Sequence, residues 1–100
     1  MNLNKNIVKK QLIQVLDPEL GISIVDLGLI YKIEIKKNKV KIVMTLTTIG
    51  CPLFSLIEQE IKNKLIELGL KEEDIVLELT FEPPWSVERM SKKAKVMLGI

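Results

Sequence analysis

TLTTIGCPL, residues 45–53, is the stretch on which the fold depends, because a strand pattern ends in it and a helix pattern begins at its end. Pro52 suits the first turn of a helix, so Cys51, the only cysteine of the chain, is expected at or beside the N-cap. Gly50, just before it, permits φ of either sign. A thiol at a helix start faces unpaired N–H groups and the positive end of the helix dipole. Both favour the thiolate, which is a nucleophile and a soft metal ligand.

Cys51 has a second interpretation, because free cysteines are often buried and then act as small hydrophobic side chains. A cap position is half exposed, which an inert core cysteine would not need. Reasoning from the residue and its position therefore leaves both a reactive thiol and a structural thiol open.

The composition indicates one globular domain over residues 1–100, with 47% hydrophobic and 28% charged residues. A net charge of +2 and 4% aromatic residues favour no nucleic-acid partner, and the apolar runs are too short to span a membrane. One cysteine allows no disulfide within the chain, and no leader pattern opens it, so we expect a cytoplasmic location. The absence of histidine excludes hydrolase triads and histidine-based metal sites, so we expect no enzyme.

The N-terminal part predicts a helix, a turn and a buried segment. Apolar residues recur at helical spacing from Ile7 to about Leu16, and residues 17–21 (DPELG) indicate a turn. The segment that follows is almost wholly apolar, so Asp26 within it must find hydrogen bonds or water. Asp26 either caps a turn through its own backbone or has a functional role, and Gly28 marks a bend.

Residues 31–36 and 40–46 predict a β-hairpin, because apolar and polar side chains alternate in both segments. Tyr31, Ile33 and Ile35 form the expected apolar row of the first strand. The polar positions and the turn are rich in lysine: Lys32, Lys36, Lys37, Lys39 and Lys41. These lysines could attract an acidic partner. We favour the interpretation that they maintain solubility and prevent edge-to-edge pairing of strands.

The C-terminal half predicts a second helix over residues 53–68, ended by Gly69, and a third strand over residues 75–81. A strand, helix, strand series requires a right-handed parallel crossover, so the three-stranded sheet should be mixed. The parallel strands should bring residues 45–53 and Trp85 to the same edge, where Trp85 is either a lid on the core or a binding surface.

The last segment predicts a short helix that begins after Ser91 as its N-cap. Three of its apolar residues are expected to point inward: Ala94, Met97 and Leu98. Its lysines are expected to face the solvent.

Several segments together resemble one family: DPELG (17–21), IVDLGLIY (24–31), MTLTT (44–48), GCPL (50–53), PPWS (83–86) and RMS (89–91). Over nearly its whole length, the chain is similar to a stand-alone iron-sulfur cluster assembly domain of the family that includes SufT and PaaD, as a SufT-like member. One departure is Ile49, where the family often has proline. The resemblance implies a two-layer α/β (α+β) domain in the order helix, strand, strand, helix, strand, helix, in agreement with the periodicity.

The resemblance also implies a role in iron-sulfur protein maturation, as a cluster carrier or as an adaptor that targets client proteins. It makes Cys51 the key thiol and the metal ligand of a shared cluster. The positions implied to bind a partner or ligand are Asp26, Thr47, Thr48, Gly50, Pro52 and Trp85. The partners implied are the iron-sulfur assembly machinery and apoprotein clients, with no nucleic acid and no membrane.

An iron-sulfur cluster normally takes four thiolates, and this chain offers one. We therefore expect no tightly bound cofactor. A labile iron-sulfur cluster held by Cys51 would be shared between chains, in a homodimer or with a partner. The alternative is a thiol-based redox sensor or catalyst that uses Cys51 without metal, although no second cysteine is present to resolve a disulfide.

Overall fold

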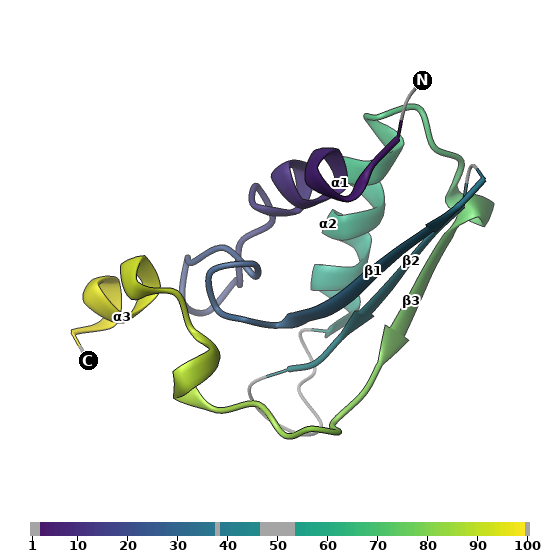
Figure 1. The fold of residues 1–100 in the computed structure, drawn as a ribbon. Coiled ribbons are helices and arrows are strands. Elements are labelled where there is room, and N and C mark those ends of the chain that lie inside the picture. Colours follow the sequence, from purple (N-terminus) through teal and green to yellow (C-terminus); the bar gives the residue numbers. More distant parts are fainter. Residues whose placement is uncertain (1–2, 38, 47–53, 100) are drawn as a thin grey trace.

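The structure is a computed structural model that describes residues 3–37, 39–46 and 54–99. Its elements follow the predicted order (Figure 1). In chain order they are α1 (Lys5–Leu12), β1 (Ile30–Lys36), β2 (Lys39–Met44), α2 (Phe54–Ile66), the 3₁₀ turn η1 (Glu72–Asp74), β3 (Ile75–Leu79), the 3₁₀ turn η2 (Val87–Arg89) and α3 (Lys92–Leu98). The predicted α+β class is confirmed.

The strands form one mixed three-stranded sheet, as predicted, and their order in it is β1-β2-β3. β1 runs antiparallel to β2, and β2 runs parallel to β3, with Val40 opposite Ile75 and Met44 opposite Leu79. The carboxyl ends of β2 and β3 therefore lie together. Beyond them the backbone of Thr80 donates a hydrogen bond to Met44 O at 2.8 Å, so the two departing segments begin side by side.

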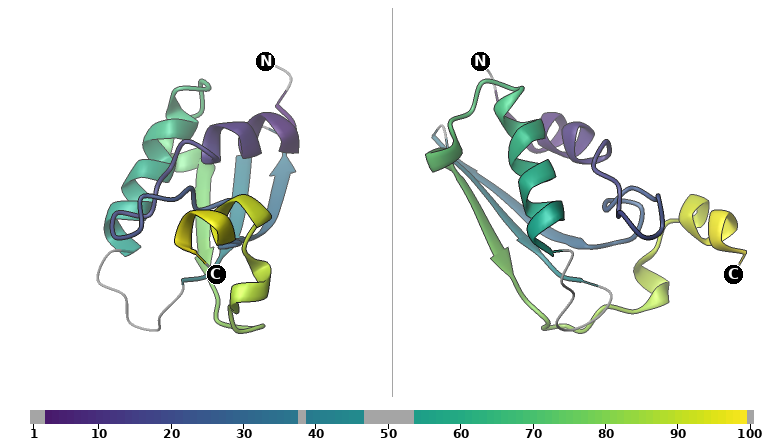
Figure 2. Two further views of the ribbon diagram at one scale, coloured as in Figure 1. Left: turned by 90° about the vertical axis from the view of Figure 1, so that its left-hand side faces the viewer. Right: turned by 180° about the vertical axis from the view of Figure 1, so that it is seen from behind.

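Helices α1 and α2 cover one face of the sheet (Figure 2). Their apolar residues recur every three or four positions and so lie on one side of each helix, where they are buried against the inward side chains of β2. The residues of this contact are Val8, Leu12, Ile57, Ile61, Leu65, Val40, Ile42 and Met44. Each large aliphatic side chain buried in this way contributes about 1.5–3 kcal/mol, so the contact between the layers is the main stabilising feature of the fold.

The first helix is shorter than predicted, because α1 ends at Leu12 and not near Leu16. The chain leaves the helix to pair with the next segment: Ile24 N donates to Val15 O at 3.0 Å, and Leu16 forms a β-bridge with Ser23. Leu16 is 53% exposed as a result. Helical periodicity alone could not detect this pairing, which depends on residues outside the helix.

The turn at residues 17–21 forms as predicted. The carboxylate of Asp17 accepts hydrogen bonds from the backbone N–H groups of Glu19 (2.8 Å) and Leu20 (3.0 Å). Such contacts are the reason that aspartate favours turns. Gly21 has a φ of 67°, a conformation that glycine adopts without strain.

The β1 strand contains a bulge that the alternating pattern did not predict. Ile30 lies opposite Met44 and Lys32 lies opposite Val43, so Tyr31 is an extra residue between two pairs. The bulge takes Tyr31 out of the apolar row to which simple alternation had assigned it.

Two predicted boundaries also change. The described part of the second helix ends at Ile66, and a turn then leads to Gly69, whose φ is 99°. The third strand ends at Leu79, two residues early, because Thr80 turns the chain by accepting a hydrogen bond from Glu82 N at 3.2 Å. Phe81 still packs against the core.

The C-terminal helix α3 begins as predicted, since Ser91 Oγ accepts a hydrogen bond from Ala94 N at 3.1 Å. Ala94 is buried, but Met97 is 55% and Leu98 is 38% exposed, so their predicted inward positions are wrong. Figure 1 shows the reason: α3 lies beside the body of the domain, away from the layer formed by α1, α2 and the sheet.

Candidate functional site

A tight turn at residues 23–29 lies at the centre of the candidate site. Leu27 N donates to Ser23 O at 2.9 Å, and Leu29 N donates to Ile24 O at 3.1 Å. The side chains of Ile24, Leu27 and Leu29 are fully buried and anchor the turn in the core. Asp26 and Gly28, at its tip, are half-buried residues that can contact other segments.

The segment before α3 packs onto this turn through two short hydrogen bonds. Trp85 Nε1 donates to Leu27 O, and Ser91 N donates to Asp26 O, both at 2.7 Å. The indole of Trp85 is half-buried against the core. Trp85 therefore covers part of the core and is joined directly to the turn that carries Asp26, whereas its predicted role as a binding surface stays a prediction.

Gly28 allows the close approach of this segment. Its φ is 76°, and a Cβ at this position would overlap the backbone carbonyl of Arg89. Glycine is required here both for the backbone conformation and for the contact. The predicted bend at Gly28 is confirmed.

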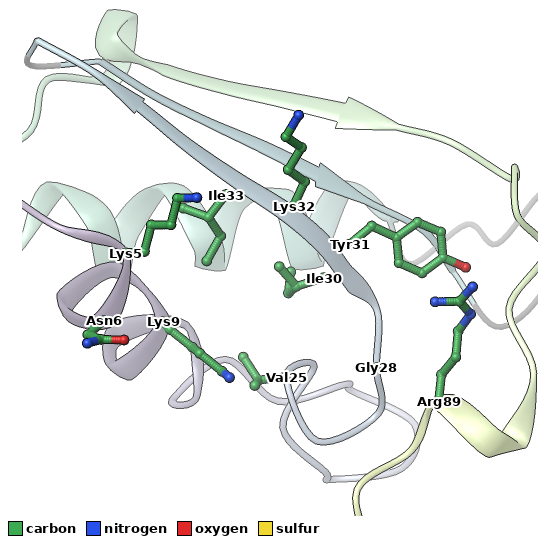
Figure 3. Close-up of a pocket in the computed structure, with 10 residues that line it drawn as sticks. All are labelled: Lys5, Asn6, Lys9, Val25, Gly28, Ile30, Tyr31, Lys32, Ile33 and Arg89. Atoms are coloured by element: carbon green, nitrogen blue, oxygen red, sulfur yellow. The ribbon is translucent and has the colours of Figure 1, made fainter.

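Tyr31 and Arg89 form a second connection between the same two segments. The Tyr31 hydroxyl donates to Pro83 O at 2.7 Å, and the Arg89 guanidinium lies 4.5 Å from the centre of the Tyr31 ring (Figure 3). This distance is that of a cation–π contact. Sequence reasoning missed the pair because alternation placed Tyr31 in the apolar row. The available signal was that both residues belong to the segments that resemble the family.

The carboxyl end of β2 lies beside the turn, because Thr45 N donates to Leu29 O at 2.8 Å. The side chain of Thr45 is completely buried, and its hydroxyl has no hydrogen-bond partner among the described residues. Leaving a buried hydroxyl unpaired costs about 1–3 kcal/mol. Three parts of the chain therefore converge: the turn, the end of β2 and the segment before α3 that contains Trp85, which is called the Trp85 segment below. At the end of β2, Leu46 is the last residue described before position 54.

The structure brings together two of the predicted site residues, Asp26 and Trp85. The other predicted positions lie outside the described residues: Thr47, Thr48, Gly50, Cys51 and Pro52. The predicted proximity of Trp85 to Cys51 therefore stays a prediction. The parallel pairing of β2 and β3, from which we derived it, is confirmed.

Asp26 was expected either to cap a turn or to have a functional role. In the described part of the chain its carbonyl oxygen accepts the Ser91 hydrogen bond, and no described residue donates to its carboxylate.

In residues 3–37, 39–46 and 54–99, no three acidic, cysteine or histidine side chains are grouped so that they could hold a metal ion. No helix in those ranges is long and apolar enough to cross a membrane.

Comparison with known proteins identifies a family that this chain matches. Residues 5–77 match the family described as iron-sulfur cluster assembly protein. YitW of Bacillus subtilis, named Fe-S protein maturation auxiliary factor, is 43% identical over 88 residues, which cover 87% of this chain and 85% of YitW. SufT of Staphylococcus aureus, which has the same descriptive name, is 42% identical over 87 residues, which cover 86% of this chain and 98% of SufT.

A solved structure has the same fold. The crystal structure of a domain of unknown function from Bacillus anthracis superposes with a TM-score of 0.89 at 40% sequence identity, and the match covers 96% of this chain and 92% of that domain. The similarity in fold therefore extends over nearly the whole chain.

Proposed function

The chain belongs to the iron-sulfur cluster assembly protein family, and we propose that it is an auxiliary factor in the maturation of iron-sulfur proteins. The observation that carries the proposal is the similarity to two maturation auxiliary factors, YitW and SufT, which covers most of each chain. Its partners would be the assembly machinery and apoprotein clients. We propose that it acts by binding and not as an enzyme. The cytoplasmic location stays a prediction.

We further propose that Cys51 is the thiol on which this function depends. The turn that carries Asp26, the end of β2 and the Trp85 segment converge where the chain enters the stretch that contains Cys51, and this supports the proposal. With one thiol per chain, an iron-sulfur cluster carried as cargo would need ligands from a second chain or a partner. A carrier would therefore hold its cluster jointly with a second chain or a partner. An adaptor would bind its client protein without a cluster.

Anaerobic reconstitution with ferrous iron and sulfide, followed by absorbance spectroscopy and size-exclusion chromatography, distinguishes the two modes. A carrier should become coloured and elute as a dimer. An adaptor should stay colourless and elute as a monomer. Reconstitution of the Cys51→Ser variant is the control, since a hydroxyl is not a soft metal ligand.

The dependence on Cys51 can be tested in cells that require this factor. Serine is close in size to cysteine and is a good helix cap, so Cys51→Ser should lose at most about 1 kcal/mol of stability. Client proteins in these cells should nevertheless contain less cluster. Ser55→Ala, an exposed substitution nearby in the chain, is the matched control and should have no effect. Full client activity with Cys51→Ser and a native melting curve would show that Cys51 is structural.

A further inference from the structure

A groove of about 480 Å³ opens between α1 and β1 (Figure 3). Val25, Ile30 and Ile33 supply its apolar surface. Lysine and arginine side chains surround this surface, and none of the ten described residues that line the groove is acidic. An apolar groove with a positively charged rim is suited to a ligand that carries both apolar and acidic groups.

The groove follows the free edge of the sheet. β1 is an edge strand that pairs only with β2 in the described sheet, so half of its backbone N–H and C=O groups face away from β2. Such an edge can accept a further strand from another protein. Figure 3 shows Ile30 and Ile33 on the α1 side of β1 and Lys32 on the opposite side, so Lys32 lines the groove only from the far side of the edge.

The positive charge of the groove is largely uncompensated in the described part of the chain. Lys32 is paired with Glu34 at 2.8 Å, on the far side of the sheet. Lys5 and Lys9 are exposed and form no ion pair with a described residue, and Arg89 contacts the ring of Tyr31. These three cations remain available to carboxylates of a bound ligand.

The groove is also preorganised. Arg89 is held in place by the packing of its backbone against Gly28 and by the hydrogen bond from Ser91 to Asp26. A binding surface that is ordered before binding loses less conformational entropy when a ligand binds.

We propose that this groove binds an extended acidic segment of a partner protein, which adds to the β1 edge as a fourth strand. Every second side chain of the added strand would point to the α1 side of the sheet. Apolar side chains of this set would contact Val25, Ile30 and Ile33, and carboxylates of the same set would lie near Lys5, Lys9 and Arg89. This inference goes beyond the proposed function, because it assigns a partner-binding surface that requires neither Cys51 nor a cluster.

The probe is a fluorescein-labelled heptapeptide with serine at every second position and with valine and glutamate taking turns at the positions between (VSESVSE), so that valine and glutamate share one face of the extended strand. Its binding to the wild-type chain is measured by fluorescence anisotropy. Saturable binding is expected, with backbone amide shifts in NMR spectra along β1 and not along β3. The same peptide with lysine in place of glutamate should not bind. Failure of the acidic peptide to bind, or shifts confined to β3, would overturn the proposal.

Two charge reversals on the same helix form a matched pair. Lys9 lines the groove, whereas Lys10 is also exposed on α1 but does not line it. Lys9→Glu replaces a weak attraction by a weak repulsion and should reduce affinity about five-fold, whereas Lys10→Glu should change it by less than about two-fold. Both variants have the same net charge, so an equal loss of affinity in both would indicate non-specific attraction and refute binding in the groove.

Strand addition is tested separately by N-methylation of the probe. In an extended peptide, successive backbone N–H groups point to opposite edges, so only one alternating set can bond to β1. Methylation of one set should abolish binding, and methylation of the other should leave it intact. Equal affinity of the two methylated peptides would overturn strand addition. None of these measurements depends on iron-sulfur maturation, so they can fail while the proposed function holds.

Discussion

Replacement of Gly28 by alanine should destabilise the domain far more than replacement of Gly21, although both glycines have a similar positive φ (76° and 67°). For alanine, a left-handed conformation costs about 1–2 kcal/mol. At Gly21 nothing lies within 4 Å of the position of an added Cβ, so this cost is the whole expected effect.

At Gly28 the added Cβ would also overlap the backbone carbonyl of Arg89, so the segment before α3 has to move. That movement would break the hydrogen bonds from Ser91 N to Asp26 O and from Trp85 Nε1 to Leu27 O, each worth about 1 kcal/mol. We therefore expect Gly28→Ala to cost about 3–4 kcal/mol in total. Gly28→Ala should therefore cost about 2 kcal/mol more than Gly21→Ala, and this difference measures the energetic effect of the close contact between Gly28 and Arg89.

Urea unfolding of both variants measures the two free energies of unfolding. Trp85 is the only tryptophan in the chain, so its native-state fluorescence reports directly on the segment that has to move. Gly28→Ala should shift the emission to longer wavelength as the indole enters water, whereas Gly21→Ala should not. Equal free-energy losses together with unchanged emission in both variants would refute the packing argument.

Thr45→Val should stabilise the domain by about 1 kcal/mol, because it replaces a buried hydroxyl that has no described partner with a methyl group; thermal unfolding checks this, and a loss of stability would reveal a partner for the hydroxyl. Trp85→Phe should cost about 1–3 kcal/mol of stability, because it leaves Leu27 O unpaired. Tyr31→Phe removes an exposed hydrogen bond that water replaces, so it should cost less. Comparable losses of stability for the two variants in urea unfolding would contradict this ranking. The hydrogen bond and charge of Lys32 lower the pKa of Glu34, so the stabilisation from this pair is present above the unfolded-state pKa and is lost as the pH falls through the folded-state pKa. An NMR titration in which Glu34 has a pKa at or above 4.5 would contradict that direction.

Local sequence patterns were sufficient where local physics decides the structure. The alternation in β1 and β2, the helical spacing in α2 and the cap at Ser91 each depend on residues within one turn or one strand pair, and the structure confirms these elements. The mixed sheet followed from the strand, helix, strand order, because the parallel crossover is a rule of chain geometry.

The patterns failed where a distant segment competes for the same backbone. α1 ends at Leu12 because the chain beyond it pairs with residues 22–24, and Met97 and Leu98 are exposed because no described element covers that side of α3. Periodicity indicates which side of a helix is apolar. It does not indicate whether another element covers that side.

For the candidate site, the sequence by itself identified Asp26 and Trp85 as residues of interest and predicted that Cys51 and Trp85 lie at one edge of the sheet. Only the tertiary structure decided that Trp85 is joined to the Asp26 turn, through Leu27 O, and that Gly28 packs against Arg89. Trp85 and Leu27 are 58 positions apart, and a side chain that donates to a backbone carbonyl at that separation leaves no periodic trace in the sequence. The groove along β1 escaped sequence reasoning for the same reason, because residues from α1, the turn, β1 and η2 line it together.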